Sequence, residues 1–172
     1  SARGHADFPL QNLPLARAAR GAREHVVTAI GDMALDLTAL SQASGLPADL
    51  GRALQPLAGG SLQQLMAAGP QASRDLRRAV FALLRADTDG ALRETAAAHL
   101  LPRADLQLLL PVRPPTFTDF YSSIHHAIRI GSLVRPDAPL LPNYKYLPVG
   151  YHGRVTSVFP SGQAFRRPKG QI

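Results

Sequence analysis

Residues 25–37 read HVVTAIGDMALDL, and this stretch decides the fold class of the N-terminal part of the chain. It holds two runs of the type that favours β-strands, residues 25–30 and 33–37. Gly31-Asp32 separates the runs, and a leading glycine permits the positive φ of a type II′ turn. The stretch therefore predicts a β-hairpin.

Helical patterns follow the hairpin. Residues 61–67 begin with capping-box spacing and predict a short helix that ends at Gly69-Pro70. Residues 73–85 place apolar side chains opposite three arginines, which predicts an amphipathic helix, and residues 89–99 predict a third helix. Residues 16–23, before the hairpin, are rich in Arg, Ala and Gly and are expected to form a connector. A hairpin with several helices predicts an α+β fold.

A change in composition marks a domain boundary. Residues 108–115 read LLLPVRPP, where proline prevents a helix from continuing and favours extended chain. We therefore expect one domain over residues 1–115 and the start of a second over residues 116–172. The polar residues of the first domain show no convergent arrangement, so a structural or docking role is expected for it.

The composition limits the class of protein. No apolar run approaches the roughly 20 residues that span a bilayer, so a soluble protein with no membrane partner is expected. The chain has no Cys, which excludes a disulfide framework, a thiolate zinc site and a cysteine nucleophile within it. The lack of Cys also fits a cytoplasmic location.

The net charge of +7 is concentrated toward the C-terminus. Residues 116–172 hold seven basic side chains against only Asp119 and Asp137. Seventeen of the nineteen basic residues are Arg, mostly scattered singly, and aromatics make up only 6%, so no nucleic-acid partner is expected. The basic excess fits a solvated face, a pocket for a polyanionic small molecule, or an acidic complement outside this chain.

Chemically versatile side chains concentrate in two short stretches of the second domain, TDFYSSIHHA at residues 118–127 and LPVGYHGR at residues 147–154. Buried polar groups need partners or cost free energy, so such concentration indicates a site rather than a purely structural segment. The glycines of the second stretch permit either a tight turn or close approach of the backbone to a ligand.

Three side chains of the first stretch are expected to meet around one small ligand. Asp119 and Tyr121 face the same side of an extended segment, and His126 lies in the first turns of a helix that Ser122 or Ser123 caps and Gly131 ends. The carboxylate can hold a hard cation, the imidazole can accept a proton from water and the phenol can orient a substrate oxygen.

Each of these residues also has a structural explanation. Asp119 can serve as a turn or cap residue, Tyr121 as a packing residue and His126 as a hydrogen-bonded histidine on a partly buried face. The adjacent His125 and His126 do not share a helix face, so a zinc site is not expected.

Several motifs occur in a fixed order along the chain: DFPLQNLP at residues 7–14, AIGD at 29–32, DFYSS at 119–123 with His126, LLPNY at 140–144, LPVGYHGR at 147–154 and RRPKGQ at 166–171. Together they resemble the fumarylacetoacetase family, strongly after residue 116 and weakly between about residues 40 and 115.

The resemblance implies a hydrolase of tyrosine and phenylalanine breakdown that splits the C–C bond of 4-fumarylacetoacetate, a dianion, into fumarate and acetoacetate with a bound Mg²⁺ or Ca²⁺. On the matching positions it implies that Asp119 is a metal ligand and that His126 is the general base. It also implies that Tyr121 and Arg135 contact the substrate and that Tyr151 lines the substrate pocket.

The resemblance further implies an architecture and a partner. Residues 1 to about 115 would form an SH3-like domain with helical segments, and residues 116–172 would open a mostly β catalytic domain of the β-roll type. This catalytic domain would form a homodimer.

The second domain is short of metal ligands. A hard cation needs six or more oxygen ligands, yet only Asp137 follows Asp119 and no Glu does. The resemblance places the remaining ligands in segments outside this chain. We therefore expect the N-terminal part of a longer enzyme, inactive alone, or a chain completed by a companion polypeptide.

Two other functions stay open. Ile128-Arg129 stands where the family usually has a small polar pair, which fits a related metal-dependent hydrolase or decarboxylase acting on another oxo acid. A non-catalytic structural or assembly module is the third reading, and it predicts no tight metal binding.

Overall fold

The computed structural model describes residue 2 and residues 4–170, so Gln171 of the RRPKGQ motif lies outside the described residues. The chain forms two compact units: one comprises the residues up to Val112 together with those from Phe159 onward, and the other is Arg113–Val158. The predicted domains, 1–115 and 116–172, stay predictions, because compactness alone does not define a domain.

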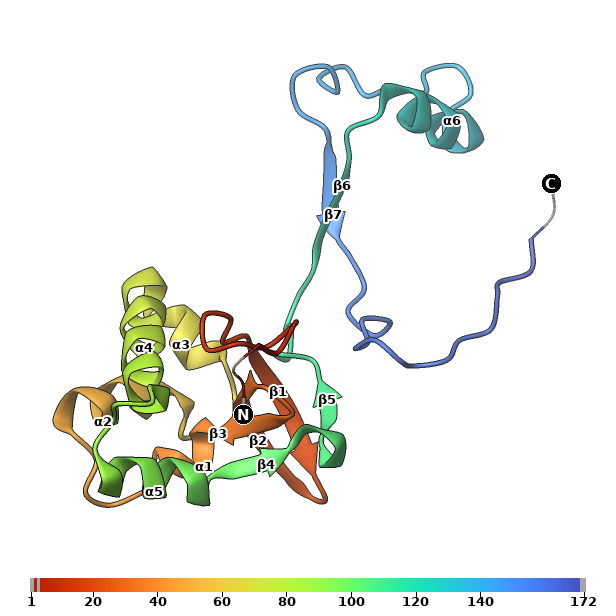
Figure 1. The fold of residues 1–172 in the computed structure, drawn as a ribbon. Helices are drawn as coiled ribbons and strands as arrows, with labels where there is room; N and C mark the ends of the chain where they lie inside the picture. Colours follow the sequence, from red (N-terminus) through yellow and green to blue (C-terminus); the bar gives the residue numbers. More distant parts are fainter. Residues whose placement is uncertain (1, 3, 171–172) are drawn as a thin grey trace. The chain divides into compact units, whose positions relative to one another are not determined.

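The first unit is built on a five-stranded antiparallel sheet with the strand order β4-β3-β2-β1-β5 (Figure 1). Its strands are β1 Leu15–Arg20, β2 Arg23–Ile30, β3 Met33–Asp36, β4 Leu100–Pro102 and β5 Gln107–Leu109.

The predicted hairpin is confirmed, because β2 pairs with β3 and Ile30 lies opposite Met33. Gly31 has a φ of 58°. No described residue other than glycine has a positive φ, so Asp32 does not. This combination fits the predicted type II′ turn and not type I′, which needs two positive φ values.

Helices gather beside one side of this sheet (Figure 1). They are α1 Leu37–Leu40, α2 Ala48–Leu54, α3 Gln63–Ala67, α4 Gly69–Leu84 and α5 Gly90–Ala98, with short 3-10 turns at Gln55–Leu57 and Arg103–Asp105. The three predicted helices correspond to α3, α4 and α5. Gly69-Pro70 begins α4 and does not only end α3, because proline is tolerated in the first helical turn.

The sheet separates two apolar clusters. Val26 and Leu35 point to a leucine-rich core that the helices complete, and their neighbours Val27 and Ala34 point to a small cluster on the other face. This alternation is the period of two that strands impose. The first unit is therefore an α+β fold, as predicted.

The second unit holds a two-stranded antiparallel sheet and one helix (Figure 1). The strands are β6 Thr118–Tyr121 and β7 Val149–His152, and the helix is α6 Ile124–Val134. Ser123 caps α6, since its side chain accepts a hydrogen bond from the His126 N–H. The predicted extended segment and helix start are both confirmed.

The predicted role of Gly131 is wrong. The helix continues through Gly131 to Val134. A Cβ at position 131 would overlap the carbonyl group of Pro139, so the glycine is required by the close approach of the returning chain.

No helix among the described residues is both long and apolar enough to cross a membrane.

Candidate functional site

A carboxylate and a phenol face each other across the sheet of the second unit. The β6–β7 register places Asp119 opposite Tyr151, and the Tyr151 hydroxyl donates a hydrogen bond of 2.8 Å to Asp119 Oδ2. Asp119 is half-buried and Tyr151 is more exposed. The strand pairing thus brings together two predicted site residues that are far apart in the sequence.

The Tyr121 ring connects this pair to the imidazole of His126. The two rings meet edge to face, with centroids 5.5 Å apart and planes at 85°. The centroid of the Tyr121 ring also lies 6.3 Å from that of the Tyr151 ring. We call Asp119, Tyr121, His126 and Tyr151 the polar cluster, and it unites four of the five predicted site residues.

Arg135 is the predicted residue that this structure does not bring to the polar cluster. It is the C-cap of α6, whereas His126 lies in the first turn. At 1.5 Å per residue, the two positions are about 13 Å apart along the helix axis. The role of Arg135 as a substrate contact stays a prediction.

The electrostatics of the polar cluster favour a protonated phenol. The pKa of Tyr151 is raised above its ordinary value, chiefly because its hydroxyl donates to the Asp119 carboxylate. Desolvation and the negative charge of Asp119 act in the same direction, and Arg154 opposes them. The hydrogen bond is therefore present at neutral pH and is lost as the pH rises through the raised pKa.

Replacing Asp119 by alanine is expected to lower the pKa of Tyr151 toward its ordinary value, because both the acceptor and the negative charge are removed. The measurement is an alkaline NMR titration of tyrosine-labelled chain, with Tyr151→Phe identifying the signal. The exposed Tyr146 supplies an internal reference signal. An unchanged Tyr151 titration in Asp119→Ala would contradict the assigned hydrogen bond.

The described residues do not form a complete metal site. No three His, Cys, Asp or Glu side chains among them lie together in a metal-binding arrangement. Asp119 is the one carboxylate of the polar cluster, and its oxygen chemistry suits a hard cation as a single ligand. The residues present thus fit one position of a Mg²⁺ or Ca²⁺ site and not the whole site.

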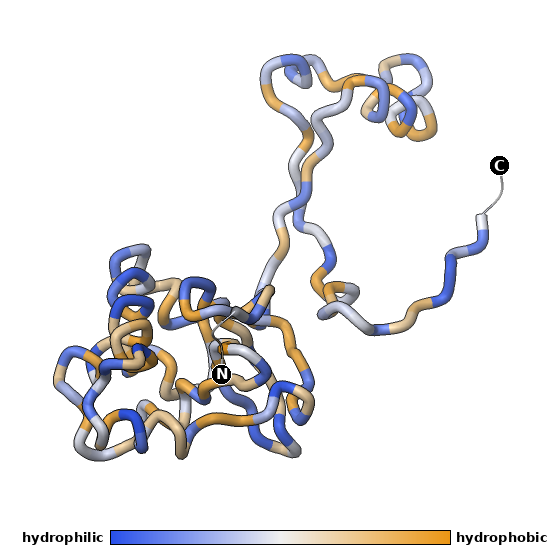
Figure 2. The backbone as a smooth tube through the Cα atoms, in the orientation of Figure 1, coloured by the Kyte–Doolittle hydropathy of each residue, from blue (hydrophilic) through white to orange (hydrophobic). Residues whose placement is uncertain are grey.

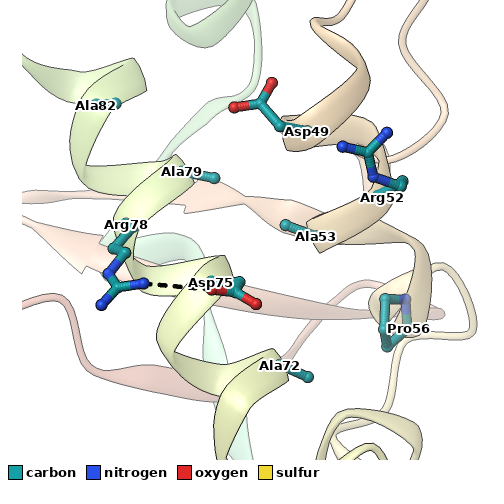
Figure 3. Close-up of a pocket in the computed structure, with 9 residues that line it drawn as sticks. All are labelled: Asp49, Arg52, Ala53, Pro56, Ala72, Asp75, Arg78, Ala79 and Ala82. Carbon is teal, nitrogen blue, oxygen red and sulfur yellow. Dashed lines mark ion pairs between the residues drawn. The ribbon is translucent and has the colours of Figure 1, made fainter.

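A hollow of about 560 Å³ lies between α2 and α4 of the first unit (Figure 3). Its lining includes Ala53, Ala72, Ala79 and Ala82, with an Arg78–Asp75 ion pair of 3.5 Å at its edge. No imidazole, hydroxyl or phenol lines it. Its carboxylates, Asp49 and Asp75, have no imidazole or hydroxyl beside them in the lining, so the hollow is a weaker candidate than the polar cluster.

Sequence reasoning missed Tyr144 as a residue of the site. This side chain is buried, and its hydroxyl donates a hydrogen bond to the backbone carbonyl of Tyr121. Tyr144 belongs to the LLPNY motif, so a motif signal was present, but nothing in the sequence indicated what its hydroxyl bonds.

An α+β unit joined to a unit that carries a carboxylate, two phenols and an imidazole suits a hydrolase, and comparison with known families agrees with that class. Residues 11–111 match the model of the Fumarylacetoacetase N-terminal domain. Because this match covers more than half of the chain, the chain belongs to the fumarylacetoacetase family.

Curated relatives give the same family. The chain is 39% identical to fumarylacetoacetase of Oryza sativa subsp. japonica, over 95% of the chain and 40% of the relative. It is 36% identical to the Caenorhabditis elegans fumarylacetoacetase, over 97% of the chain and 41% of the relative. It is 37% identical to the Homo sapiens fumarylacetoacetase, over 96% of the chain and 41% of the relative. The chain thus spans about two fifths of the length of these relatives.

Proposed function

We propose that this chain contributes part of the active site of a hydrolase that cleaves 4-fumarylacetoacetate into fumarate and acetoacetate in tyrosine and phenylalanine breakdown. The observation that carries the proposal is the polar cluster, which joins a carboxylate, two phenols and an imidazole in a chain of the fumarylacetoacetase family. The names of the curated relatives support the same substrate.

His126 is the proposed general base. Its side chain is exposed, so water can reach it, and a neutral imidazole accepts a proton near neutral pH. The hydroxide so formed adds to the carbonyl carbon that becomes the new carboxylate of fumarate. The C–C bond then breaks, its electron pair leaves with the acetoacetate carbon, and that carbon takes up a proton.

The remaining predicted residues hold the substrate. Tyr121 and Tyr151 present phenols that can orient substrate oxygens, and Arg135 would pair with a carboxylate of the dianion. Asp119 would supply one oxygen ligand to Mg²⁺ or Ca²⁺. When bound, such a cation polarises substrate oxygens and stabilises negative charge on the leaving enolate.

Further polypeptide is proposed to complete the second unit. A two-stranded sheet is marginal alone, and the second unit leaves Phe120, Leu133, Val134 and Leu147 exposed. Figure 2 shows hydrophobic stretches along α6. We propose that the rest of a mostly β, β-roll catalytic domain covers them and supplies acidic metal ligands, from the same chain or from a companion chain.

The finer architecture belongs to the same proposal. The sheet of the first unit would be SH3-like, and the complete enzyme would be a homodimer. A cytoplasmic location fits the absence of Cys from the chain.

The test uses the native protein, meaning every polypeptide that purifies with this chain. Intact mass under denaturing conditions identifies those polypeptides, and an assay with added Mg²⁺ or Ca²⁺ follows 4-fumarylacetoacetate. Equal amounts of fumarate and acetoacetate are the expected products. Residues 1–172 alone should give none. A folded native protein that leaves the substrate intact would refute the proposed function.

One observation favours a second candidate, a non-catalytic assembly module: the second unit exposes Phe120, Leu133, Val134 and Leu147, and exposed apolar side chains of this kind suit contact with other polypeptides. This candidate expects no tight divalent-cation binding by the native protein. It also expects that His126→Ala leaves the interaction with the other polypeptides intact and that the native protein has no hydrolase activity.

A further inference from the structure

Tyr144 is an unusual residue within the second unit. Its side chain is 6% exposed, while Tyr146, two residues on in the same loop, is 90% exposed. Among the described residues of the second unit, only Ala127, Gly131 and Tyr144 are buried. Burying a phenol is costly unless its hydroxyl has a partner, so the partner of Tyr144 indicates what the residue does.

The partner is the backbone carbonyl of Tyr121, which accepts a hydrogen bond of 3.2 Å from the Tyr144 hydroxyl. Tyr121 is the last residue of β6, and only Ser122 and Ser123 separate it from α6. The first turn of α6 carries His126. The hydrogen bond therefore holds the chain immediately before the helix that presents the proposed base.

The loop that carries Tyr144 is also held against α6. Gly131 lies within α6, and the backbone of Pro139 approaches so closely that any Cβ at position 131 would overlap it. Residues 135–148 thus contact the strand end at one point and the helix at another. Such a loop fixes the strand and the helix relative to each other.

The arrangement of Tyr121 and His126 needs a fixing element of this kind. The His126 side chain is exposed, and its contact with the Tyr121 ring is edge to face. A ring contact at an exposed position is too weak to fix a rotatable side chain by itself. The relative placement of Tyr121 and His126 therefore depends largely on the backbone positions that the contacts of Tyr144 and Gly131 hold.

We propose that Tyr144 is a positioning residue, which through the Tyr121 carbonyl sets the placement of Tyr121 relative to His126. Tyr144 touches no reacting atom in this arrangement. The positioning itself is a property of this chain, and only its consequence for catalysis rests on the proposed function.

The first test compares Tyr144→Phe with Tyr146→Phe in the native protein, with this chain isotope-labelled for NMR. Each variant removes one phenolic oxygen, from a buried and an exposed site respectively. The readout is the ring-current shift of the His126 imidazole protons, assigned with His126→Gln, because an edge-to-face neighbour perturbs these signals.

Tyr144→Phe is expected to move the His126 signals toward those of a histidine without a ring neighbour, while the α6 backbone signals persist. Tyr146→Phe should leave them in place. Gly131→Ala, which disturbs the second contact of the loop, should move them in the same direction as Tyr144→Phe. Unmoved His126 signals in Tyr144→Phe would overturn the proposal. Loss of the α6 signals would also overturn it, because Tyr144 would then be a general folding residue.

The second test measures turnover of 4-fumarylacetoacetate by the native protein. Tyr144→Phe is expected to lower kcat about tenfold with little change in KM, because a misplaced base slows the chemical step more than binding. Tyr146→Phe should retain both constants. Shifted His126 signals with an unchanged kcat would support the positioning and contradict the proposed role of His126, so the two claims fail separately.

Discussion

Replacing His126 by glutamine in the native protein is expected to lower kcat for 4-fumarylacetoacetate by about 10²- to 10⁴-fold, the usual contribution of a general base. Glutamine keeps a polar side chain on the exposed face of α6 but cannot accept the proton of the attacking water. KM should change little, because the imidazole is proposed to act on water and not to hold the substrate.

His125→Gln is the matched control for this experiment. His125 is adjacent and exposed, but neighbouring residues on a helix point to different faces, so it does not share the orientation of His126. The measurement is steady-state kinetics of both variants, with circular dichroism to show that each retains its fold. Equal kinetics for the two variants would contradict the assignment of His126 as the base.

The parts of the fold that depend on neighbouring residues could be predicted from the sequence. The hairpin rests on Gly31-Asp32 between two β-type runs, and the start of α6 rests on Ser123. In each case the decisive group lies within a few residues of the element it sets, so local chemistry suffices.

Strand β1 could not be predicted in this way. Its sequence LARAAR has few residues with a β preference, and the Arg, Ala and Gly content of residues 16–23 is typical of a connector. Pairing with β2 on one side and β5 on the other makes it a strand, and β5 comes from the far end of the unit. Arg17 can be buried there because its guanidinium donates hydrogen bonds to the Glu24 carboxylate and to the backbone carbonyl of Leu110.

In the candidate site, too, the features set by nearby residues could be predicted and those set by distant residues could not. The period of two predicted that Asp119 and Tyr121 face together, and both lie on the half-buried side of β6. The hydrogen bond from Tyr151 depends on the β6–β7 register, which no local pattern specifies. The prediction that Gly131 ends the helix was wrong because the sequence does not distinguish a glycine that ends a helix from one that allows a neighbouring backbone to approach closely.

Shortening Leu54 to alanine is expected to destabilise the first unit by about 2–5 kcal/mol, the usual range for a buried leucine. Leu54 ends α2, is 0% exposed and lies in the leucine-rich core between helices and sheet. The variant loses the transfer free energy of the removed methyl groups and leaves a cavity, because close-packed neighbours relax only in part. Urea unfolding measures the free energy, followed by signals of the first unit alone, since two units need not unfold together.

Leu108→Ala is the control, because it removes the same atoms from a side chain that is 57% exposed. It should cost less than about 1 kcal/mol, in proportion to the smaller apolar area withdrawn from water. The difference between the two variants isolates burial from the intrinsic change of leucine to alanine. Similar costs for both would show that the helices do not enclose Leu54 against the sheet, and the two-cluster description of the first unit would then be wrong.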